Sequence, residues 1–538
     1  RLDFSKADTI VSFGAGFLET WISPVEYARQ WAATRNPARK GGVSQFVHVE
    51  PRLSMTAANA DVWLRNAPGT DVQLLQALLK AVLNTPAANR GGSAARAAAE
   101  RLVENCSIPE VLSRSGVERK RFEAVVKRLA RPGTSLVVAG GAAFGDGSAV
   151  PAGVLAFALN AVLGNIGKTV LLYRRQSPRS SGMAAMAKLL EDMKQKDSPI
   201  GLLVIAGVNP SFVLPPELGF DRSLGNVPLI VALTTNLDET AVNAHLVLPA
   251  STSFESWGDS EPIPGTFALN QPAMQPLYES MCLGDVLIAV GAKLGQTFGE
   301  ANDFHHYIRA QWQQRTGGAK SEEQWLDVVQ RGGDFSGSQQ PLSNWTFAQD
   351  VPALPDTDTP SGLTLIAFPT VRGVDGQTAN RPWIQELPDP MTTVVWGSWV
   401  EMHPQTAERL KIKDKQVVEI RTSQGKLRSP VYLTKHLHPD ALAMPLGNGH
   451  TGYGRYAAGV GVNPLEIMPA SATAATVSLM ARGVSVVPAV DEDRMVKVQG
   501  EDSQLKRGIV RWVQDGNLDH HLGMAGHGGG EHKMQGDM

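Results

Sequence analysis

Three short runs of aliphatic and β-branched residues, each ending in a glycine turn, constrain the fold of this chain more than any other feature. The runs lie at residues 9–13, 135–139 and 202–206, and a glycine follows each of them directly. Continuous apolar runs of this length are typical of parallel strands that are buried on both faces. Further predicted strands are residues 46–49, 169–172 and 228–233.

Helical spacing of apolar residues fills the intervals between these strands. It is clearest over residues 71–82, where leucines recur three and four positions apart. The alternation of strand and helix predicts an α/β fold with parallel sheets, and we expect two such units, at residues 1–130 and 131–314. The other predicted helices are residues 26–34, 94–104, 118–129, 154–163 and 182–194.

The amino-acid composition of the chain changes after residue 314. Residues 315–362 are rich in glycine, proline and polar side chains, which predicts a linker or a long excursion. Alternating runs at 416–422 and 426–433 flank a Ser-Gln-Gly turn and predict a β-hairpin, so we expect a β-rich domain over residues 363–515. The tail at 516–538 contains four histidines and a glycine run; a solvated end and a metal-binding tail are both open.

Composition excludes several classes of function. The chain has 538 residues with 50 Lys and Arg against 52 Asp and Glu, so no basic excess points to nucleic acid or to an anionic membrane. Only Cys106 and Cys282 are present, which excludes a disulfide framework and any four-cysteine iron–sulfur or zinc site made by this chain alone. The most apolar stretch, 149–170, includes Pro151 and Lys168 and therefore predicts a buried helix rather than a membrane span.

Two glycine-containing turns imitate nucleotide-binding motifs incompletely. Gly14-Ala15-Gly16 follows a strand, but Glu19 stands where the third glycine of a dinucleotide fingerprint belongs. A plain turn and a ligand at the carboxyl edge of the sheet both remain open there. Residues 164–169 resemble a phosphate loop, but Val162 replaces its first glycine, which argues against a nucleoside triphosphatase.

Three polar segments are candidate binding sites. Gly207 and Asn209 follow a strand directly, where a turn and an amide could bind a purine or pterin edge or merely begin an extended segment. Asn236 and Asp238 lie in a polar loop that could bind guanine and ribose, although Asp238 could equally cap a helix. Asn448 and His450 lie in a glycine-dense loop that could hold a cofactor or simply turn. No catalytic triad, carboxylate pair or protein-ligated metal site has spacing support.

Six segments in order resemble the molybdopterin oxidoreductase superfamily, of the dimethyl-sulfoxide-reductase type. The resemblance covers nearly the whole chain and implies two doubly wound parallel-sheet units followed by a C-terminal double-psi β-barrel domain. The segments are Ile10–Gly14, Val49–Thr56, Leu163–Gly167, Gly207–Pro210, Asp238–Pro249 and Trp399–Asp414.

A narrower resemblance joins residues 17–24 and 379–390 to one branch of this superfamily. That branch includes the large B subunit of alternative complex III and the related subunit of a periplasm-facing quinone reductase complex. It implies a molybdopterin fold without the molybdenum cofactor, beside an iron–sulfur subunit, a multihaem cytochrome c subunit and a quinone-binding integral membrane subunit. The family's cysteines for one [4Fe–4S] cluster and its usual molybdenum ligand would lie before Arg1. No cysteine follows Trp512, which favours the quinone-reductase type.

The resemblance therefore implies a periplasm-facing subunit of a membrane-bound respiratory quinone-linked oxidoreductase, acting as a scaffold or electron relay without a catalytic site of its own. Two alternatives stay open. In an active molybdenum enzyme, Gly207, Asn209, Asn236, Asp238, Asn448 and His450 would hold two pyranopterin guanine dinucleotides. In a purely structural subunit, there would be no redox role. A cavity lined by those residues favours the molybdenum enzyme, whereas Trp21, Arg381 or Trp383 filling it opposes that function.

Overall fold

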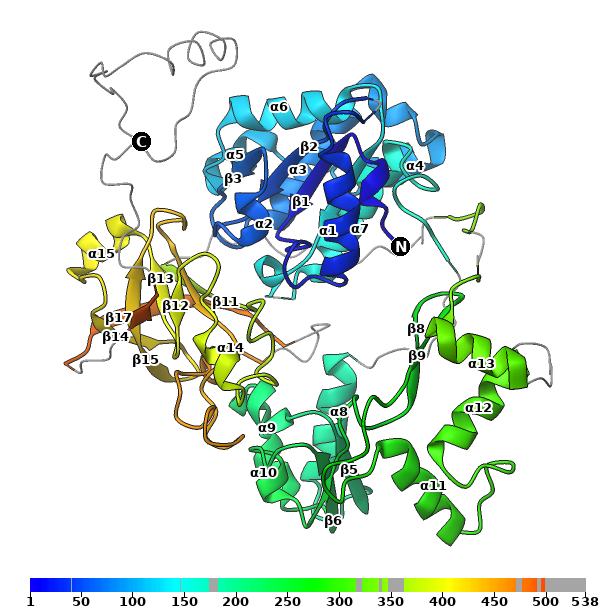
Figure 1. Cartoon of the computed structure of the whole chain (residues 1–538). Coiled ribbons are helices and arrows are strands. Elements are labelled where there is room, and N and C mark those ends of the chain that lie inside the picture. Colours follow the sequence, from blue (N-terminus) through cyan, green and yellow to red (C-terminus); the bar gives the residue numbers. More distant parts are fainter. Residues whose placement is uncertain are drawn as a thin grey trace, which may run out of the picture. The chain divides into compact units, whose positions relative to one another are not determined.

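The computed structural model of the chain (Figure 1) describes residues 1–39, 41–145, 147–173, 182–315, 322–337, 341–346, 362–470, 477–490 and 495–498. The chain divides into two units, Arg1–Val496 and Lys497–Met538. The first unit contains the sheets and helices that position the candidate sites. The predicted tail at 516–538 lies outside the described residues.

Four parallel strands form the first sheet, in the spatial order β3–β2–β1–β4. Ile10 on β1 pairs with Phe46 on β2 and with Leu136 on β4. Because β2 and β4 lie on opposite sides of β1, the strand order reverses between β1 and β4, and this sheet has a topological switch point there. The strands are β1 (Thr9–Phe13), β2 (Gln45–Val49), β3 (Val62–Leu64) and β4 (Ser135–Ala139).

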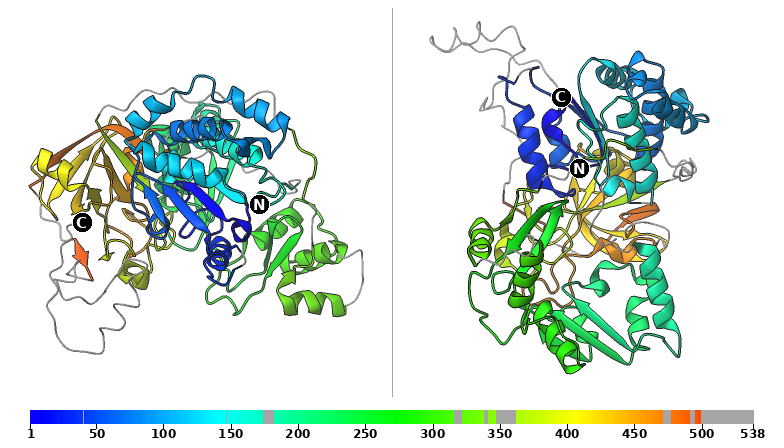
Figure 2. Two further views of the ribbon diagram at one scale, coloured as in Figure 1. Left: turned by 90° about the horizontal axis from the view of Figure 1, so that it is seen from above. Right: turned by 90° about the vertical axis from the view of Figure 1, so that its right-hand side faces the viewer.

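Helices cover both faces of this sheet, which is why its strands are apolar on both faces. Val11 packs into a cluster with the leucines of α3, whereas its neighbour Ile10 packs with Tyr27 of α1 on the opposite face. Figure 2 shows the blue and cyan helices on both sides of the strands. The helices are α1 (Pro24–Thr34), α2 (Met55–Ala58), α3 (Asp71–Leu83), α4 (Ser93–Arg101), α5 (Ile108–Ser115), α6 (Arg119–Ala130) and α7 (Ala149–Val162).

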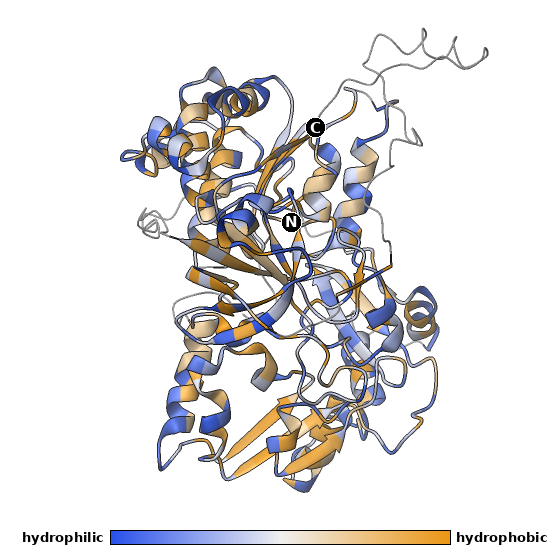
Figure 3. Cartoon of the chain, turned by 90° about the vertical axis from the view of Figure 1, so that its left-hand side faces the viewer, coloured by the Kyte–Doolittle hydropathy of each residue, from blue (hydrophilic) through white to orange (hydrophobic). Residues whose placement is uncertain are grey.

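The second parallel sheet has three strands in the order β5–β6–β7. Ile205 and Ile230 pack with Leu190 on the face that α8 and α10 cover. On the opposite face Leu202 and Leu229 are paired and remain 53% and 43% exposed; these strands are orange at the bottom of Figure 3. The elements are α8 (Met183–Lys194), β5 (Leu202–Ala206), α9 (Pro210–Val213), α10 (Phe220–Leu224), β6 (Leu229–Thr234) and β7 (Leu246–Pro249).

A small helical subdomain follows, built around an antiparallel sheet of order β10–β9–β8. Its core contains Leu269, Ile308, Trp312, Trp325 and Val328. The elements are β8 (Gly258–Ile263), β9 (Thr266–Asn270), α11 (Leu283–Lys293), α12 (Phe304–Arg315), α13 (Glu322–Arg331) and β10 (Gly333–Asp334).

The C-terminal region is a closed barrel of order β11–β16–β13–β15–β14–β17, which confirms the predicted β-barrel domain. The predicted hairpin is β14 and β15, with Ile420 paired to Leu427 across it. The barrel interior is aliphatic and includes Leu365, Val418 and Val431. The elements are β11 (Leu363–Phe368), α14 (Pro382–Glu386), β12 (Val394–Val395), β13 (Val400–Met402), α15 (Pro404–Leu410), β14 (Val417–Arg421), β15 (Lys426–Leu433), β16 (Ala441–Pro445), β17 (Met480–Pro488) and β18 (Val496–Lys497).

Three details differ from the sequence-based expectations. The boundary predicted at residue 130 falls inside the region of the first parallel sheet, because β4 pairs with β1 and α7 packs back onto β4. Residues 169–172 form no strand; Val170 makes only isolated bridges to Leu2 and Ile166. The predicted linker at 315–362 includes α13 and β10, because Trp325 and Val328 supply part of a hydrophobic core.

None of the helices within the described residues is both long enough and apolar enough to cross a membrane. The predicted buried helix is α7, whose Leu155 and Leu159 are fully buried in the first core. Burial in a protein core therefore accounts for the apolar stretch that begins at residue 149.

Candidate functional site

A cavity of about 420 Å³ lies at the switch point of the first sheet. Open α/β sheets bind ligands at this position, outside the carboxyl ends of the strands. The turns after β1, β2 and β4 line one side of the cavity, and residues beside β11 and β17 line the other. The lining is Gly14, Gly16, Glu19, Thr20, Trp21, Glu50, Arg52, Ser54, Ala139–Ala142, Phe144, Gly145, Ala149, Phe368, Pro369, Val477 and Leu479.

The indole of Trp21 covers the end of β4. A Cβ atom built on Gly140 would lie 2.2 Å from Trp21 Nε1, so only a glycine leaves space for the ring. The next residue, Gly141, has a φ of +82°, and a Cβ there would lie 2.1 Å from the carbonyl oxygen of Gly14. The two glycines therefore let the backbone after β4 pass between the indole and the β1 turn.

Glu19 folds over the turn that follows β1. A Cβ on Gly16 would lie 3.0 Å from Glu19 Cγ, and Glu19 Oε1 accepts a hydrogen bond from the backbone N–H of Thr56 at 3.0 Å. This carboxylate therefore lies beside the glycine turn that a dinucleotide pyrophosphate would approach in a complete fingerprint. A negative charge at that position repels a phosphate.

Arg52 and Glu401 form a buried ion pair at the wall of the same cavity. Arg52 Nε lies 2.8 Å from Glu401 Oε2, and Arg52 Nη2 lies 2.9 Å from Oε1. The guanidinium also stacks on the ring of Phe368, 3.6 Å from its centre. Burial alone would lower the pKa of Arg52, but the charge of Glu401 and its hydrogen bonds raise that pKa above its ordinary value. Arg52 is therefore positively charged.

A second polar cluster lies at the carboxyl edge of the second sheet, with Glu239 at its centre. Asn209 Nδ2 donates to Glu239 Oε2 at 2.7 Å. The backbone N–H groups of Thr451 and Gly452 donate to Oε1 at 2.8 and 2.9 Å. Burial alone would raise the pKa of Glu239, but the hydrogen bonds from His450, Gly452 and Asn209 hold that pKa far below its ordinary value. Glu239 is therefore a carboxylate whose oxygens are fully used inside the protein.

Four residues of the chain contact the imidazole ring of His450. Its ring stacks on Phe212, with centres 3.7 Å apart and planes 8° from parallel, and on Tyr453 at 4.8 Å. Its Nδ1 lies 3.2 Å from Glu239 and its Nε2 lies 3.2 Å from the carbonyl oxygen of Gly376. Both ring nitrogens therefore lie within hydrogen-bonding distance of oxygen atoms of the chain.

The other predicted site residues also have partners within the chain. Asp238 Oδ1 accepts from the backbone N–H groups of Thr240 and Ala241, which is the capping role, and burial raises its pKa in spite of those bonds. Asn236 Oδ1 accepts from Asn380 at 3.2 Å, and Asn448 Nδ2 donates to the carbonyl oxygen of Gly397 at 2.6 Å. Gly207 has a φ of +65° and forms the turn after β5.

The structure thus brings Asn209 and His450 together through Glu239, while Asp238, Asn236 and Asn448 each bond to other partners. Glu239, Arg52 and Glu401 were not among the predicted site residues, although all three lie inside the segments on which the resemblance rests. Glu401 is a charged side chain between the apolar Val400 and Met402, which is a signal, whereas no local pattern separates Glu239 from the other polar residues of its loop. Of the three side chains expected to fill a cavity, Trp21 lines the cavity at the first sheet, whereas Arg381 is exposed and Trp383 is 67% exposed.

Two parallel-sheet regions that precede a closed barrel, with glycine turns at the carboxyl edges of the strands, define a class of mixed α/β protein. The chain belongs to the molybdopterin oxidoreductase family, whose model matches residues 2–287. The model of the molydopterin dinucleotide binding domain matches residues 363–481, which include most of the barrel.

Three individual proteins are also similar to this chain. The chain is 28% identical to the menaquinone reductase, molybdopterin-binding-like subunit of Nitratidesulfovibrio vulgaris, over 87% of this chain and 69% of the relative. It is 20% identical to the assimilatory nitrate reductase catalytic subunit of Bacillus subtilis, over 76% of this chain and 66% of that protein. The solved structure of acetylene hydratase from Pelobacter acetylenicus shares the fold, with a TM-score of 0.69 and 13% identity, over 91% of this chain and 79% of that one.

The residues at both sheet edges do not fit a pair of pyranopterin guanine dinucleotides. The polar atoms of Asn209 and Glu239 are paired with one another, and His450 is stacked on both faces. Glu19 lies beside the β1 turn. A cavity of about 420 Å³ is near the lower end of the range for a single drug-sized ligand, roughly 300–1,000 Å³. The volume of the cavity is therefore that of a site for one small molecule.

Proposed function

We propose that the chain is a subunit of a membrane-bound respiratory quinone-linked oxidoreductase, that it faces the periplasm, and that it serves as a scaffold or electron relay without a molybdenum cofactor. Membership of the molybdopterin oxidoreductase family supports the redox context. Likeness over 87% of the chain to a protein named as a menaquinone reductase subunit supports the link to quinone and to partner subunits.

The observation that carries the cofactor-free part of the proposal is the closed cluster of Glu239 and His450. A ligand at this sheet edge would have to break the pairing of Asn209 with Glu239 and separate the Phe212–His450–Tyr453 stack. Each buried polar group left without a partner costs about 1–3 kcal/mol, so opening the cluster is unfavourable unless the ligand replaces every contact.

In this function the chain needs no acid, base or nucleophile. Electron relay depends on the spacing and shielding of cofactors that other segments or subunits hold. We propose an iron–sulfur subunit, a multihaem cytochrome c subunit and a quinone-binding membrane subunit as partners, and a [4Fe–4S] cluster bound upstream of Arg1. The parallel-sheet units and the barrel would then act as a rigid support.

Elemental analysis of the native complex tests the proposal. Molybdenum and iron are measured per copy of this chain, and the protein is denatured to extract any pterin for fluorescence. Iron without molybdenum or pterin is the expected result. One molybdenum atom per chain together with extractable pterin would overturn the proposal.

One observation favours a second candidate, an active molybdenum oxidoreductase that acts on a small substrate. The positively charged Arg52 and the glycine turns after β1 and β4 line a cavity at the switch point, where α/β proteins bind ligands. A family model of a dinucleotide-binding domain also matches the barrel region. The same elemental analysis distinguishes the two candidates, because only this one requires molybdenum.

A further inference from the structure

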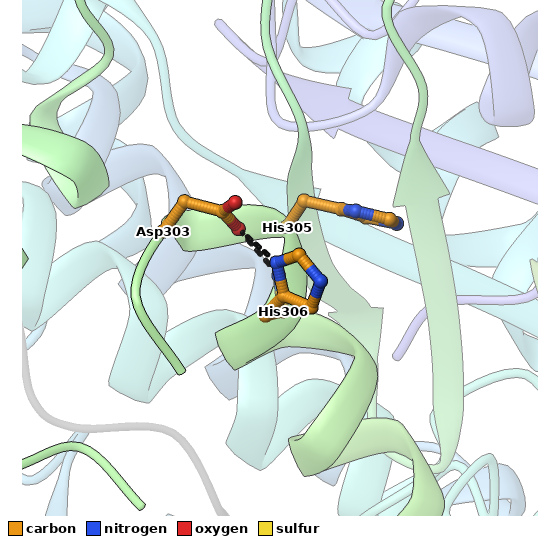
Figure 4. Close-up of side chains that lie close together, drawn as sticks. All are labelled: Asp303, His305 and His306. Carbon is orange, nitrogen blue, oxygen red and sulfur yellow. Dashed lines mark hydrogen bonds and ion pairs between the residues drawn. The ribbon is translucent and has the colours of Figure 1, made fainter. Parts of the chain in front are cut away.

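Two histidines and an aspartate meet at the start of α12, far along the chain from both sheet edges. One possible ligand atom from each of Asp303, His305 and His306 lies within 4.8 Å of the others (Figure 4). Asp303 Oδ1 lies 2.8 Å from His306 Nδ1, and the imidazole centres of His305 and His306 are 5.4 Å apart. From the sequence, histidines of the tail were the candidate metal ligands, and these three residues were not predicted.

The surrounding residues hold two of the three side chains in place. The ring of His305 stacks on Trp257, with centres 4.4 Å apart, and lies 5.9 Å from the ring of Trp325. Asp303 is fixed by a hydrogen bond from the backbone N–H of His306 at 2.8 Å. Ordinary helix capping explains the position of Asp303. It does not explain why two imidazoles are placed beside the capping carboxylate, one of them held by stacking against tryptophan.

We propose that Asp303, His305 and His306 bind one divalent transition-metal ion. Carboxylate oxygen and imidazole nitrogen are ligands for such ions, and three protein ligands leave the remaining positions for water. The ion displaces the proton of His306 Nδ1, which passes to solvent, and takes its place between that nitrogen and Asp303 Oδ1.

The ligand set selects among metals. Imidazole nitrogen suits zinc(II), copper(II) and nickel(II), and copper(II) stands highest in the affinity order of the divalent ions. The 2.8 Å between Asp303 Oδ1 and His306 Nδ1 is the length of their hydrogen bond, so the two atoms are already close enough to share one ion. Copper(II) is therefore the probe of choice.

Charge around the site is compatible with a cation. Arg309, one turn further along α12, forms an ion pair with Glu322. Asp303 and His306 remain about half exposed, so an ion and its water ligands can enter without rearrangement of the core. The proposal is independent of the proposed function, because none of these residues contacts either sheet edge.

Copper(II) binding to the full chain tests the proposal. The histidines of the tail would compete, so His520, His521, His527 and His532 are first replaced together by asparagine in the full-length protein. Binding is then measured by calorimetry and by electron paramagnetic resonance. We expect one copper(II) ion per chain, with splitting from two imidazole nitrogens.

Single variants in that background assign the ligands. H305A and H306A should each weaken copper(II) binding about tenfold or more and remove one nitrogen from the spectrum. D303N retains an N-cap side chain, so it should weaken binding while the melting temperature is kept. H436N, at an exposed histidine of the barrel domain, is the matched control and should bind as the parent does. Unchanged binding in both H305A and H306A, or no one-to-one binding in the parent, would overturn the proposal.

Discussion

Arg52 and Glu401 lie 349 residues apart in the sequence and make a two-pronged ion pair with side chains only 6% and 4% exposed. Trp399 Nε1 also donates to Glu401, at 3.4 Å, and Phe368 covers the guanidinium. The pair joins the segment after β2 to strand β13 of the barrel. A cooperative link between these two regions follows from it.

We predict that Arg52→Met and Glu401→Gln each destabilise the protein by about 3–5 kcal/mol, because each leaves a buried group without its partner. The double variant should cost clearly less than the sum of the two single variants. Calorimetric unfolding of the four proteins measures the coupling. Arg35→Met, which breaks the more exposed pair with Asp61, is the control and should cost no more than about 1 kcal/mol. Additive losses would show that the buried pair does not act as a unit.

Stability should fall in acid because of Glu239. Its pKa is depressed in the folded state relative to an ordinary value of 4.5, so it contributes stability above about pH 4.5 that is lost as the pH falls below that value. The melting temperature of the parent should therefore approach that of Glu239→Gln as the pH is lowered from 7 to below 4.5.

Asp238→Asn provides the contrast, since burial raises the pKa of Asp238. Protonation of Asp238 favours the folded state. The melting temperature of the parent should therefore rise relative to that of Asp238→Asn as the pH is lowered over the same range. A constant difference between the parent and Glu239→Gln across this pH range would contradict the assigned role of Glu239.

The contact between Gly140 and Trp21 should be revealed by overpacking. Gly140→Ala places a methyl group against the indole and should destabilise the protein by about 1–3 kcal/mol. The same substitution in a Trp21→Ala background should cost much less, because the indole is gone. Gly153→Ala, in helix α7 with nothing within 4 Å of the added methyl, is the control and should stabilise by about 0.5–1 kcal/mol. Equal costs in both backgrounds would place the clash elsewhere.

Both cysteines should be free and slow to react. Burial raises the pKa of Cys106 and of Cys282, so little thiolate is present at neutral pH. We expect slow alkylation of the native protein by iodoacetamide at pH 7.5 and rapid alkylation of two thiols after denaturation. Cys282→Ser retains a capping side chain for α11 and should leave one thiol at unchanged stability. Loss of both thiols in the denatured protein would indicate a disulfide bond between the cysteines.

Local patterns in the sequence predicted the elements well but not their neighbours. The apolar runs at β1, β4 and β5 and the hairpin of β14 and β15 follow from side-chain periodicity and turn residues. The position of β4 beside β1 depends on the connection from β3, residues 65–134, about 70 residues long, which no local pattern encodes. A boundary at residue 130 would separate β4 from the sheet to which it belongs.

The same distinction applies to the sites. Asn209 and His450 were chosen as polar residues beside glycine turns, and the structure joins them through Glu239. Glu239 was not chosen because its role depends on donors from a loop more than 200 residues away. The cluster of Asp303, His305 and His306 was also not predicted, because stacking of His305 on Trp257 is a tertiary contact.

The distance in sequence between Arg52 and Glu401 has a consequence for synthesis of the protein. At about 5–20 residues per second, the ribosome needs about 20–70 s after Arg52 to add Glu401. Throughout that interval the nascent chain contains a guanidinium whose final partner does not yet exist. The first parallel-sheet region therefore acquires this ion pair only after residue 401 has been added. A product that is truncated before residue 401 has an arginine without its ion-pair partner.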